Sequence, residues 1–324
     1  MTAIQTQDLV KVYAGKIRAL DGVTFDVREG EVFALLGPNG AGKTTTVRIL
    51  TTLSKPTSGT ARVAGFDVSR DAGKVRQQIG VVAQKASLDP TSTGRENLVL
   101  QGRFFGLGGR KLKQRVDELL GIVGLTDAAD RLAGTYSGGM ARRLDIAIGL
   151  VHRPRVLFLD EPTTGLDPEV RAAMWDEIRR LAAQEGLTIL LTTHYLEEAD
   201  RLARRLAILD KGKVVTIGTP EALKAELRGD AIAIELGNGA READVRSALA
   251  AVAGIGELKL DNHTVHLRVA AGASALPGVL NVLDANGVAV ASATVSRPSL
   301  DDVYLRHTGR SFASADRTLQ EATR

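Results

Sequence analysis

The residues best suited to chemistry in this sequence lie in a glycine-rich segment. The segment Gly37-Pro-Asn-Gly-Ala-Gly-Lys-Thr44 fits the pattern G-x-x-x-x-G-K-[ST]; it follows the apolar run Val32–Leu36 and precedes a predicted helix, residues 43–53. Glycine lets backbone amides fold around phosphate oxygens where side chains would collide, and a helix start adds partial positive charge. Lys43 can bridge the β- and γ-phosphates, and Thr44 can offer its hydroxyl to Mg²⁺. Because strand, helix and the following Thr45 are all in place, a turn that matches by chance is disfavoured, and the segment predicts a nucleotide-binding loop.

Two adjacent acids supply what a phosphate-binding loop lacks for hydrolysis. Asp160 and Glu161 follow the apolar run Val156–Leu159, which predicts a buried strand. Ligands bind at the carboxyl ends of strands in parallel sheets. We therefore expect Asp160 to hold the Mg²⁺ shell and Glu161 to orient or deprotonate the attacking water. A strand that simply ends in an acidic turn is the alternative, which two adjacent acids followed by Pro162 make less favoured.

The composition excludes several classes of protein. Of 324 residues, 44% are hydrophobic and 25% charged, which is typical of a globular protein, and the absence of cysteine excludes a disulfide scaffold and a cysteine–zinc site. The net charge of +4 comes with no basic tract, so no nucleic-acid partner is predicted. The longest apolar runs are strand-sized, well below the roughly 18 residues of a membrane span, and Met1–Val10 is unlike a signal peptide. If the chain serves a membrane, we expect a separate spanning partner.

Apolar runs and helical periodicity alternate over the first two-thirds of the chain. Alternation of strands and helices predicts an α/β domain, residues 1–222, with a parallel sheet core and an antiparallel β part. A helical subdomain, about 91–151, is inserted in it, with capping-box spacing from Thr93 to Glu96. One face of a helix in that stretch carries the apolar residues Leu112, Val116, Leu119 and Val123. The predicted strands are 3–10, 20–27, 32–36, 79–83, 155–160 and 187–192, and a further helix is predicted over 168–185.

The pattern changes near Gly218 and predicts a second domain, residues 223–310. Thr219-Pro220-Glu221 has an N-cap, a first-turn proline and an acid, and predicts a helix start. The elements that follow read strand 231–236, helix 241–252, strands 257–260 and 264–269, helix 273–283 and strand 288–295. This βαββαβ order predicts a small ferredoxin-like α+β domain with an accessory or regulatory role. A last helix is predicted from Ser299, and residues 311–324 are predicted to be a flexible tail.

These motifs together resemble the nucleotide-binding subunit of ATP-binding cassette transporters, over residues 4–219. The resemblance implies that Tyr13 stacks on adenine, Gln84 reaches Mg²⁺ and the attacking water, and His194 is the γ-phosphate switch. Ser137 to Gly139 occupy the signature position, and Asp167 lies in the loop across the dimer axis. The implied nucleotide site is Tyr13, Gly37, Pro38, Asn39, Gly40, Ala41, Gly42, Lys43, Thr44, Thr45, Ser137, Gly138, Gly139 and Asp167, with ATP and Mg²⁺ as cofactors. The implied metal residues are Thr44, Gln84 and Asp160, and the implied catalytic residues are Glu161, His194 and Gln84.

The resemblance also implies an assembly. In the family the signature of one protomer closes on the phosphate-binding loop of the other, so we expect a homodimer that serves a separate integral-membrane permease. The expected location is the cytoplasmic face of the cell membrane, as a peripheral subunit. One departure matters, since Tyr136 and Met140 stand where the family's usual signature, Leu-Ser-Gly-Gly-Gln, has Leu and Gln.

Three short features narrow the resemblance to one branch of the family. They are Tyr-Ser-Gly-Gly-Met140, Gly218-Thr-Pro-Glu221 and Arg297-Pro-Ser-Leu-Asp-Asp-Val-Tyr304. They are similar to those of the daunorubicin/doxorubicin-resistance type of bacterial export ATPase, which implies drug export. The alternatives are the ATPase of an importer and a cassette ATPase with no transport role.

Overall fold

The computed structural model describes residues 1–85, 87–227, 229–237, 242–250, 252, 254–261 and 263–315. The chain divides into two compact units, Met1–Ile217 and Gly218–Arg324, and each has a hydrophobic core of its own. The predicted boundary at residue 222 falls inside the helix α8 (Pro220–Ala225), which belongs to the second unit. A hydrogen bond ties the end of α8 to the second unit, since Arg306 Nη1 donates to the carbonyl of Glu226 at 2.9 Å.

Two sheets build the first unit. The larger has the strand order β10-β9-β3-β8-β7-β6, and its central strands pair in parallel. These strands are β3 (Val32–Leu36), β6 (Ile79–Val82), β7 (Val156–Asp160), β8 (Thr188–Thr193), β9 (Arg205–Asp210) and β10 (Lys213–Gly218). The smaller sheet is antiparallel in the order β2-β1-β4-β5, formed by β1 (Thr2–Val12), β2 (Arg18–Arg28), β4 (Ser58–Val63) and β5 (Phe66–Asp67). Strands β7 and β8 are buried along their whole length, which explains their near-continuous apolar sequence.

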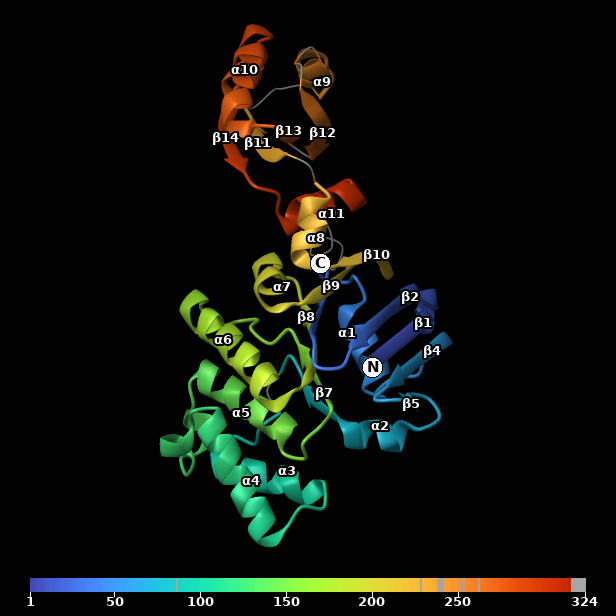
Figure 1. Ribbon diagram of the computed structural model, residues 1–324, viewed down its shortest axis with the longest axis vertical. Helices are drawn as coiled ribbons and strands as arrows, with labels where there is room; N and C mark the ends of the chain where they lie inside the picture. The colour runs from blue at the N-terminus through green and yellow to red at the C-terminus, as the bar shows by residue number, and fades with distance from the viewer. Residues whose placement is uncertain are drawn as a thin grey trace. The chain divides into compact units, whose positions relative to one another are not determined.

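Helices cover the parallel sheet and add a separate helical group. Those that connect the strands are α1 (Lys43–Leu50), α2 (Ala72–Gln78), α6 (Pro168–Glu185) and α7 (Leu196–Leu202). The inserted group is α3 (Gly94–Phe104), α4 (Gly109–Ile122) and α5 (Gly138–Leu150), which gather at one end of this unit (Figure 1). The capping box that begins α3 joins Thr93 and Glu96 as the spacing predicts. The four predicted core positions of α4 and its end, Leu112, Val116, Leu119 and Val123, are at most 4% exposed.

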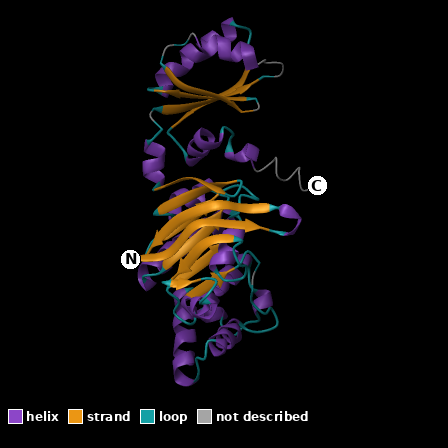
Figure 2. Cartoon of the chain, turned by 90° about the vertical axis from the view of Figure 1, so that its right-hand side faces the viewer, coloured by secondary structure: helices purple, strands orange, loops and turns teal. Residues whose placement is uncertain are grey.

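The second unit has the βαββαβ order. Its elements are β11 (Asp230–Leu236), α9 (Glu242–Ala250), β12 (Ile255–Asp261), β13 (Thr264–Val269), α10 (Gly272–Ala285) and β14 (Val290–Ser296). The sheet is antiparallel in the order β12-β13-β11-β14, and two helices cover one of its faces (Figure 2). This arrangement is the ferredoxin-like fold that the sequence predicts.

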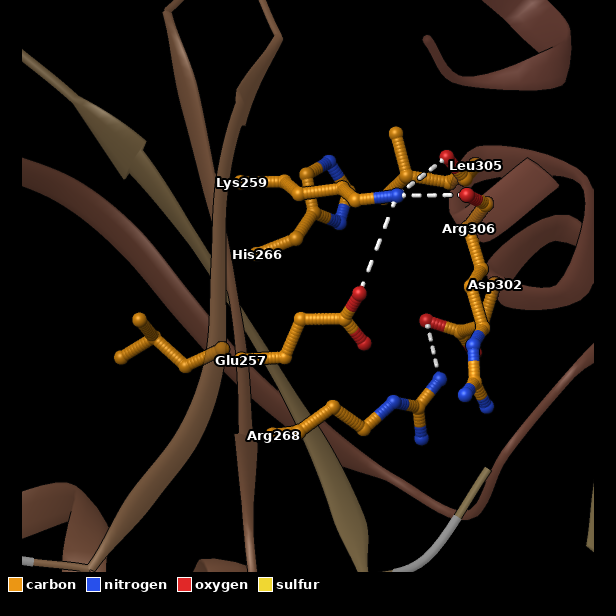
Figure 3. A pocket seen from close by; sticks show the side chains of 8 residues that line it. Glu257, Lys259, His266, Arg268, Asp302, Leu305 and Arg306 are labelled. Carbon is orange, nitrogen blue, oxygen red and sulfur yellow. Dashed lines mark hydrogen bonds and ion pairs between the residues drawn. The ribbon is translucent and has the colours of Figure 1, made fainter. Parts of the chain in front are cut away.

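The other face of that sheet holds the helix α11 (Leu300–Thr308) by charged side chains. Alternate residues of a strand point to opposite faces. The apolar residues of β12 and β13 enter the core, so Lys259 on β12 and Arg268 on β13 lie on the face opposite the core. Lys259 Nζ donates to the carbonyls of Leu305 and Arg306, each at 2.8 Å, and Arg268 Nη2 lies 2.9 Å from Asp302 Oδ1 (Figure 3). The ammonium group therefore satisfies carbonyls at the last turn of α11, where a helix favours positive charge.

The predicted flexible tail is wrong for its first five residues. Residues 312–315 form a helical turn, and Phe312 is buried with its ring edge-on to Tyr304, the ring centroids 5.0 Å apart. Ser311 N also donates to Asp261 Oδ2 at 2.7 Å. The buried ring and hydrogen bonds to Asp261 and Asp301 hold this segment, and the rest of the predicted tail, 316–324, lies outside the described residues.

Candidate active site

The glycine-rich loop runs from the end of β3 to the start of α1. Gly40 and Gly42 have φ values of 72° and 106°, a region that favours glycine. A Cβ at Gly42 would lie 2.7 Å from the carbonyl of Ala19, and one at Gly37 would lie 2.5 Å from the carbonyl of Leu209. Side chains at these positions would therefore displace backbone, and the loop conformation depends on glycine.

The loop closes around Lys43, which is only 4% exposed. Its Nζ donates to the carbonyls of Gly37 and Pro38, at 2.8 and 3.2 Å. No side chain caps the start of α1 in the described part of the chain. The loop thus offers the positive end of a helix and an ammonium group to one position, which fits a phosphate group.

Glu161 is the centre of the polar cluster beside this loop. Its Oε1 lies 3.4 Å from Lys43 Nζ. Its Oε2 accepts hydrogen bonds from Gln84 Nε2 at 3.4 Å and Thr164 Oγ1 at 3.2 Å. The same oxygen lies 3.2 Å from His194 Nδ1, but the angle between the two groups does not fit a hydrogen bond. The fold therefore brings together the three predicted catalytic residues from the ends of different strands, and adds Thr164, which sequence reasoning missed.

The environment of Glu161 favours its ionised form. Burial by itself would raise the pKa of this carboxyl, but contact with His194 and the charge of Lys43 outweigh it and lower the pKa to about 2. At neutral pH the side chain is a carboxylate, as a general base must be. Its backbone has a φ of 49°, which is strained for a residue other than glycine and is typical of functional positions.

Asp160 and Thr44 form a second pair, next to Glu161. Thr44 Oγ1 lies 3.4 Å from Asp160 Oδ1, and Thr192 Oγ1 donates to the same carboxylate oxygen at 2.5 Å. Hydroxyl and carboxylate oxygens are ligands that Mg²⁺ prefers, and it usually takes only one or two carboxylates from the protein. No group of three His, Cys, Asp or Glu that could hold a metal occurs among the described residues. The pair therefore fits a Mg²⁺ ion that takes its other ligands from phosphate and water.

Thr192 is a site residue that the sequence analysis missed. It accepts a hydrogen bond from Glu161 N at 3.0 Å while it donates to Asp160, so one hydroxyl holds both acids. Strands β7 and β8 are neighbours, with Asp160 directly opposite Thr192. In the sequence, Thr192 stands out only as a polar residue at the end of an apolar strand. It can be assigned to the site once β7 and β8 are known to be neighbours.

We predict that Thr192→Val lowers kcat more than it weakens ATP binding. Valine keeps the shape but removes the closer donor to the buried Asp160 Oδ1 and leaves the longer, 3.4 Å contact with Thr44 Oγ1, which costs about 1–3 kcal/mol of stability. The measurement is the ATPase rate and the affinity of a fluorescent ATP analogue. Thr188→Val, on the same strand and also buried, is the control, because its hydroxyl accepts from Gly30 N, away from the site. Equal loss of kcat in both variants would contradict the role given to Thr192.

The signature residues lie at the start of α5. Ser137 is the N-cap residue, and its Oγ accepts from Met140 N at 3.3 Å. Ser137 and Gly138 are exposed, and a Cβ at Gly139 would lie 2.8 Å from Val170 Cγ1. An exposed helix N-terminus with glycines is suited to bind a phosphate group presented from outside the protomer.

Arg142 is a second residue that sequence reasoning missed. It lies on α5, is buried, and donates from Nε to the carbonyl of Pro162 at 2.7 Å and from Nη1 to that of Ala83 at 2.6 Å. Nη2 donates to the carbonyl of Asp160 at 3.3 Å. This guanidinium therefore ties the helix that carries the signature to the residue before Gln84 and to the acid pair.

The remaining predicted residues have separate positions. Tyr13 is 37% exposed, with Lys11 Nζ 5.0 Å from its ring centroid, so its ring is accessible for stacking. Asp167 caps α6, where its Oδ1 accepts from Val170 N at 2.9 Å. Thr45 lies in the first turn of α1. Their contacts with a nucleotide stay predictions.

Comparison with known proteins decides the family. The ABC transporter family model matches residues 20–164, and that of the "ATP-binding protein DrrA1-3-like, C-terminal domain" matches residues 218–308. The daunorubicin resistance ATP-binding protein DrrA2 of Streptomyces coeruleorubidus is 48% identical over 95% of this chain and 95% of its own length. The chain belongs to the ATP-binding cassette transporter ATPases. The daunorubicin/doxorubicin resistance ATP-binding protein DrrA of Streptomyces peucetius is 44% identical over 99% of this chain and 96% of its own.

Further relatives agree with this family. The linearmycin resistance ATP-binding protein LnrL of Bacillus subtilis is 36% identical over 95% of this chain and 99% of its own length. Among solved structures, cbiO1 from Clostridium perfringens has a TM-score of 0.65 and 26% identity, over 78% of this chain and 96% of that one. The ATP-binding cassette MJ0796, solved as a dimer bound to ADP and Pi, has a TM-score of 0.60 and 28% identity, over 67% and 98%.

The comparisons confirm the predicted family branch, fold class and ATPase activity. They favour the ATPase subunit of an exporter over the importer and non-transport alternatives. No helix among the described residues is long and apolar enough to cross a membrane.

Proposed function

We propose that this ATPase works as a homodimer with Mg²⁺ at the cytoplasmic face of the membrane, where it powers export of a toxic compound through a separate permease. The cluster of Glu161 with Lys43, His194 and Gln84 is the observation that supports hydrolysis most directly. The drug-resistance names of the relatives support the class of cargo.

Each residue of the cluster has a role that follows from its position. Glu161 is ionised at neutral pH and is held at Oε2 by Gln84 and Thr164, so it can orient the attacking water and accept its proton as the P–O bond forms. Lys43 binds phosphate oxygens, and His194 contacts the same carboxylate from the end of β8. Bound Mg²⁺ would neutralise phosphate charge, with Thr44, Gln84 and Asp160 as its protein ligands.

The dimer is supported by where the two halves of the proposed site lie. Lys43 and Glu161 contact each other, so the loop and the acid belong to one half-site. Ser137 and Gly138 are exposed, and Gly138 and Gly139 adjoin Leu166 and Val170 of the same chain. A partner can therefore receive Ser137–Gly139 over its own loop, and the related cassette MJ0796 has been solved as a dimer.

We predict that Lys43→Ala weakens ATP binding about 10- to 100-fold, the factor carried by one charge-assisted hydrogen bond. Alanine removes the buried ammonium and leaves the loop carbonyls of Gly37 and Pro38 without their donor. The affinity is measured with a fluorescent ATP analogue. The control is Lys74→Ala, an exposed lysine that pairs with Asp71. Unchanged affinity in Lys43→Ala would contradict the loop assignment.

Transport itself is tested in inside-out membrane vesicles that contain the chain and its candidate permease. We expect ATP-dependent accumulation of a subset of amphipathic antibiotics, with ATPase activity stimulated by the same compounds. Vesicles that contain Glu161→Gln should accumulate none. Equal accumulation in that variant, or ATPase activity that no permease alters, would overturn the export proposal.

A further inference from the structure

Tyr136 is the signature residue that the proposed chemistry does not use. It directly precedes the N-cap residue Ser137, and its side chain is half-buried. Its hydroxyl donates to the carbonyl of Ala128 at 2.6 Å, and burial raises the pKa of this hydroxyl, so it remains a donor at neutral pH. The leucine usual at this position could not make this bond.

The same side chain rests on the start of α3. A Cβ at Gly94, the first residue of α3, would lie well under 3.0 Å from Tyr136 Oη and 3.2 Å from Cζ. Gly94 is buried, so no solvent separates the two. The absence of a side chain at Gly94 is what makes room for the tyrosine hydroxyl.

Backbone hydrogen bonds join the two chain segments on either side of this contact. Residues 90–95 lead into α3, and residues 128–134 lead into the signature. The bonds run from Gly94 N to Arg131 O (3.3 Å), Arg95 N to Ala129 O (2.8 Å), Ala133 N to Ser92 O (2.8 Å) and Gly134 N to Pro90 O (2.9 Å). The start of α3 and the approach to the signature are therefore held together along their backbones.

We propose that Tyr136 is a positioning residue, whose hydroxyl bond to Ala128 and seat on Gly94 fix the orientation of Ser137–Gly139 relative to the start of α3. A displacement of α3 is then carried to the amides that serve the partner protomer. The backbone bonds between residues 90–95 and 128–134 reach Gly134, three residues before Ser137. Tyr136, directly before Ser137, adds a side-chain contact from the signature to the start of α3. The inference rests on the proposed homodimer.

The test uses the full chain with Tyr136→Phe, Gly94→Ala and the double variant. Tyr136→Phe removes one hydrogen bond, so kcat and ATP-driven dimerisation should fall about two- to tenfold. ATP affinity of the single protomer should stay within about twofold, because the loop around Lys43 is untouched. Gly94→Ala should lower kcat further, since its Cβ meets the hydroxyl. Gly73→Ala, a helical glycine with open space around it, is the control and should change none of these values.

The double variant separates positioning from simple destabilisation. Removing the hydroxyl relieves the closest contact and leaves the ring carbon Cζ at 3.2 Å, so Gly94→Ala/Tyr136→Phe should recover kcat above Gly94→Ala and towards the level of Tyr136→Phe alone. A lack of recovery, or a Tyr136→Phe protein with the dimerisation and kcat of the wild type, would overturn the inference. Dimerisation is measured by light scattering with ATP in a Glu161→Gln background, which stops turnover. If that background fails to dimerise with Tyr136 intact, the homodimer proposal fails instead.

Discussion

Glu161→Gln is expected to abolish ATP hydrolysis and to preserve ATP binding. Glutamine has nearly the same shape as glutamate but cannot accept a proton from water at neutral pH. General-base catalysis contributes about 10²–10⁴-fold in rate, so turnover should fall by at least about two orders of magnitude. The carboxylate is ionised in the folded protein, with a pKa of about 2, so the variant removes a full negative charge.

ATP binding should survive because the loop does not depend on that charge. Lys43 keeps its two carbonyl acceptors, Gly37 and Pro38, when its 3.4 Å contact with Glu161 is weakened. The site also no longer presents a carboxylate to the terminal phosphate of ATP, which removes a like-charge repulsion. Binding without hydrolysis should hold the two protomers together.

Two measurements check this prediction. Phosphate release reports turnover, and size-exclusion chromatography with and without ATP reports the dimer. Glu169→Gln, an exposed acid in the first turn of α6, is the matched control and should hydrolyse ATP at the wild-type rate. Normal phosphate release from Glu161→Gln would remove Glu161 from its role.

The sequence was most informative where the functional residues are contiguous along the chain. The loop that ends at Thr44 and the acids that follow β7 are each contiguous, and the chemistry of each needs only its own neighbours along the chain. Thr192 and Arg142 could not be recognised in this way. Their contacts span 32 residues, from Thr192 to Asp160, and 59 residues, from Arg142 to Ala83, and exist only because particular strands and helices are neighbours.

In the second unit, too, local patterns could be predicted from the sequence and a contact between distant residues could not. Its βαββαβ order could be predicted because each element has an apolar periodicity of its own. The helical turn at residues 312–315 could not be predicted, because Phe312 is one large apolar residue in a polar run. Its partner Tyr304 belongs to another helix. A single anchoring aromatic leaves no periodic pattern.

Arg142→Met is expected to lower both stability and turnover. The arginine donates to three carbonyls and lies 3.9 Å from Asp145 Oδ2. Methionine fills similar space but supplies no donor, so buried carbonyls and a buried carboxylate lose their partner. Breaking a buried ion pair on one side costs about 3–5 kcal/mol. Turnover should fall even well below the unfolding temperature, because Ala83 precedes Gln84 and Asp160 precedes Glu161.

The adjacent arginine provides the control. Arg143 also lies on α5 but makes one hydrogen bond, from Nη1 to the carbonyl of Val123 at 3.1 Å, at a less buried position. Arg143→Met should therefore cost about 1 kcal/mol or less and leave turnover unchanged. Denaturant unfolding and the ATPase rate distinguish the two variants. Equal losses would show that Arg142 has no special link to the site.

A second substitution should restore part of the lost stability, because part of the loss comes from leaving the buried Asp145 carboxylate without the charge of Arg142. Burial raises the pKa of this carboxyl, while the hydrogen bonds from Ser87 to Oδ1 and then the charge of Arg142 oppose that rise. Among the described residues no donor reaches Oδ2, so Arg142 is the partner on that side of the carboxylate. Asparagine at this position could still accept from Ser87 through Oδ1. Arg142→Met/Asp145→Asn should therefore be more stable than Arg142→Met. Turnover should stay low in the double variant, since the carbonyls of Ala83 and Asp160 remain without their donor. Recovery of both properties together would mean that the arginine acts only by neutralising Asp145.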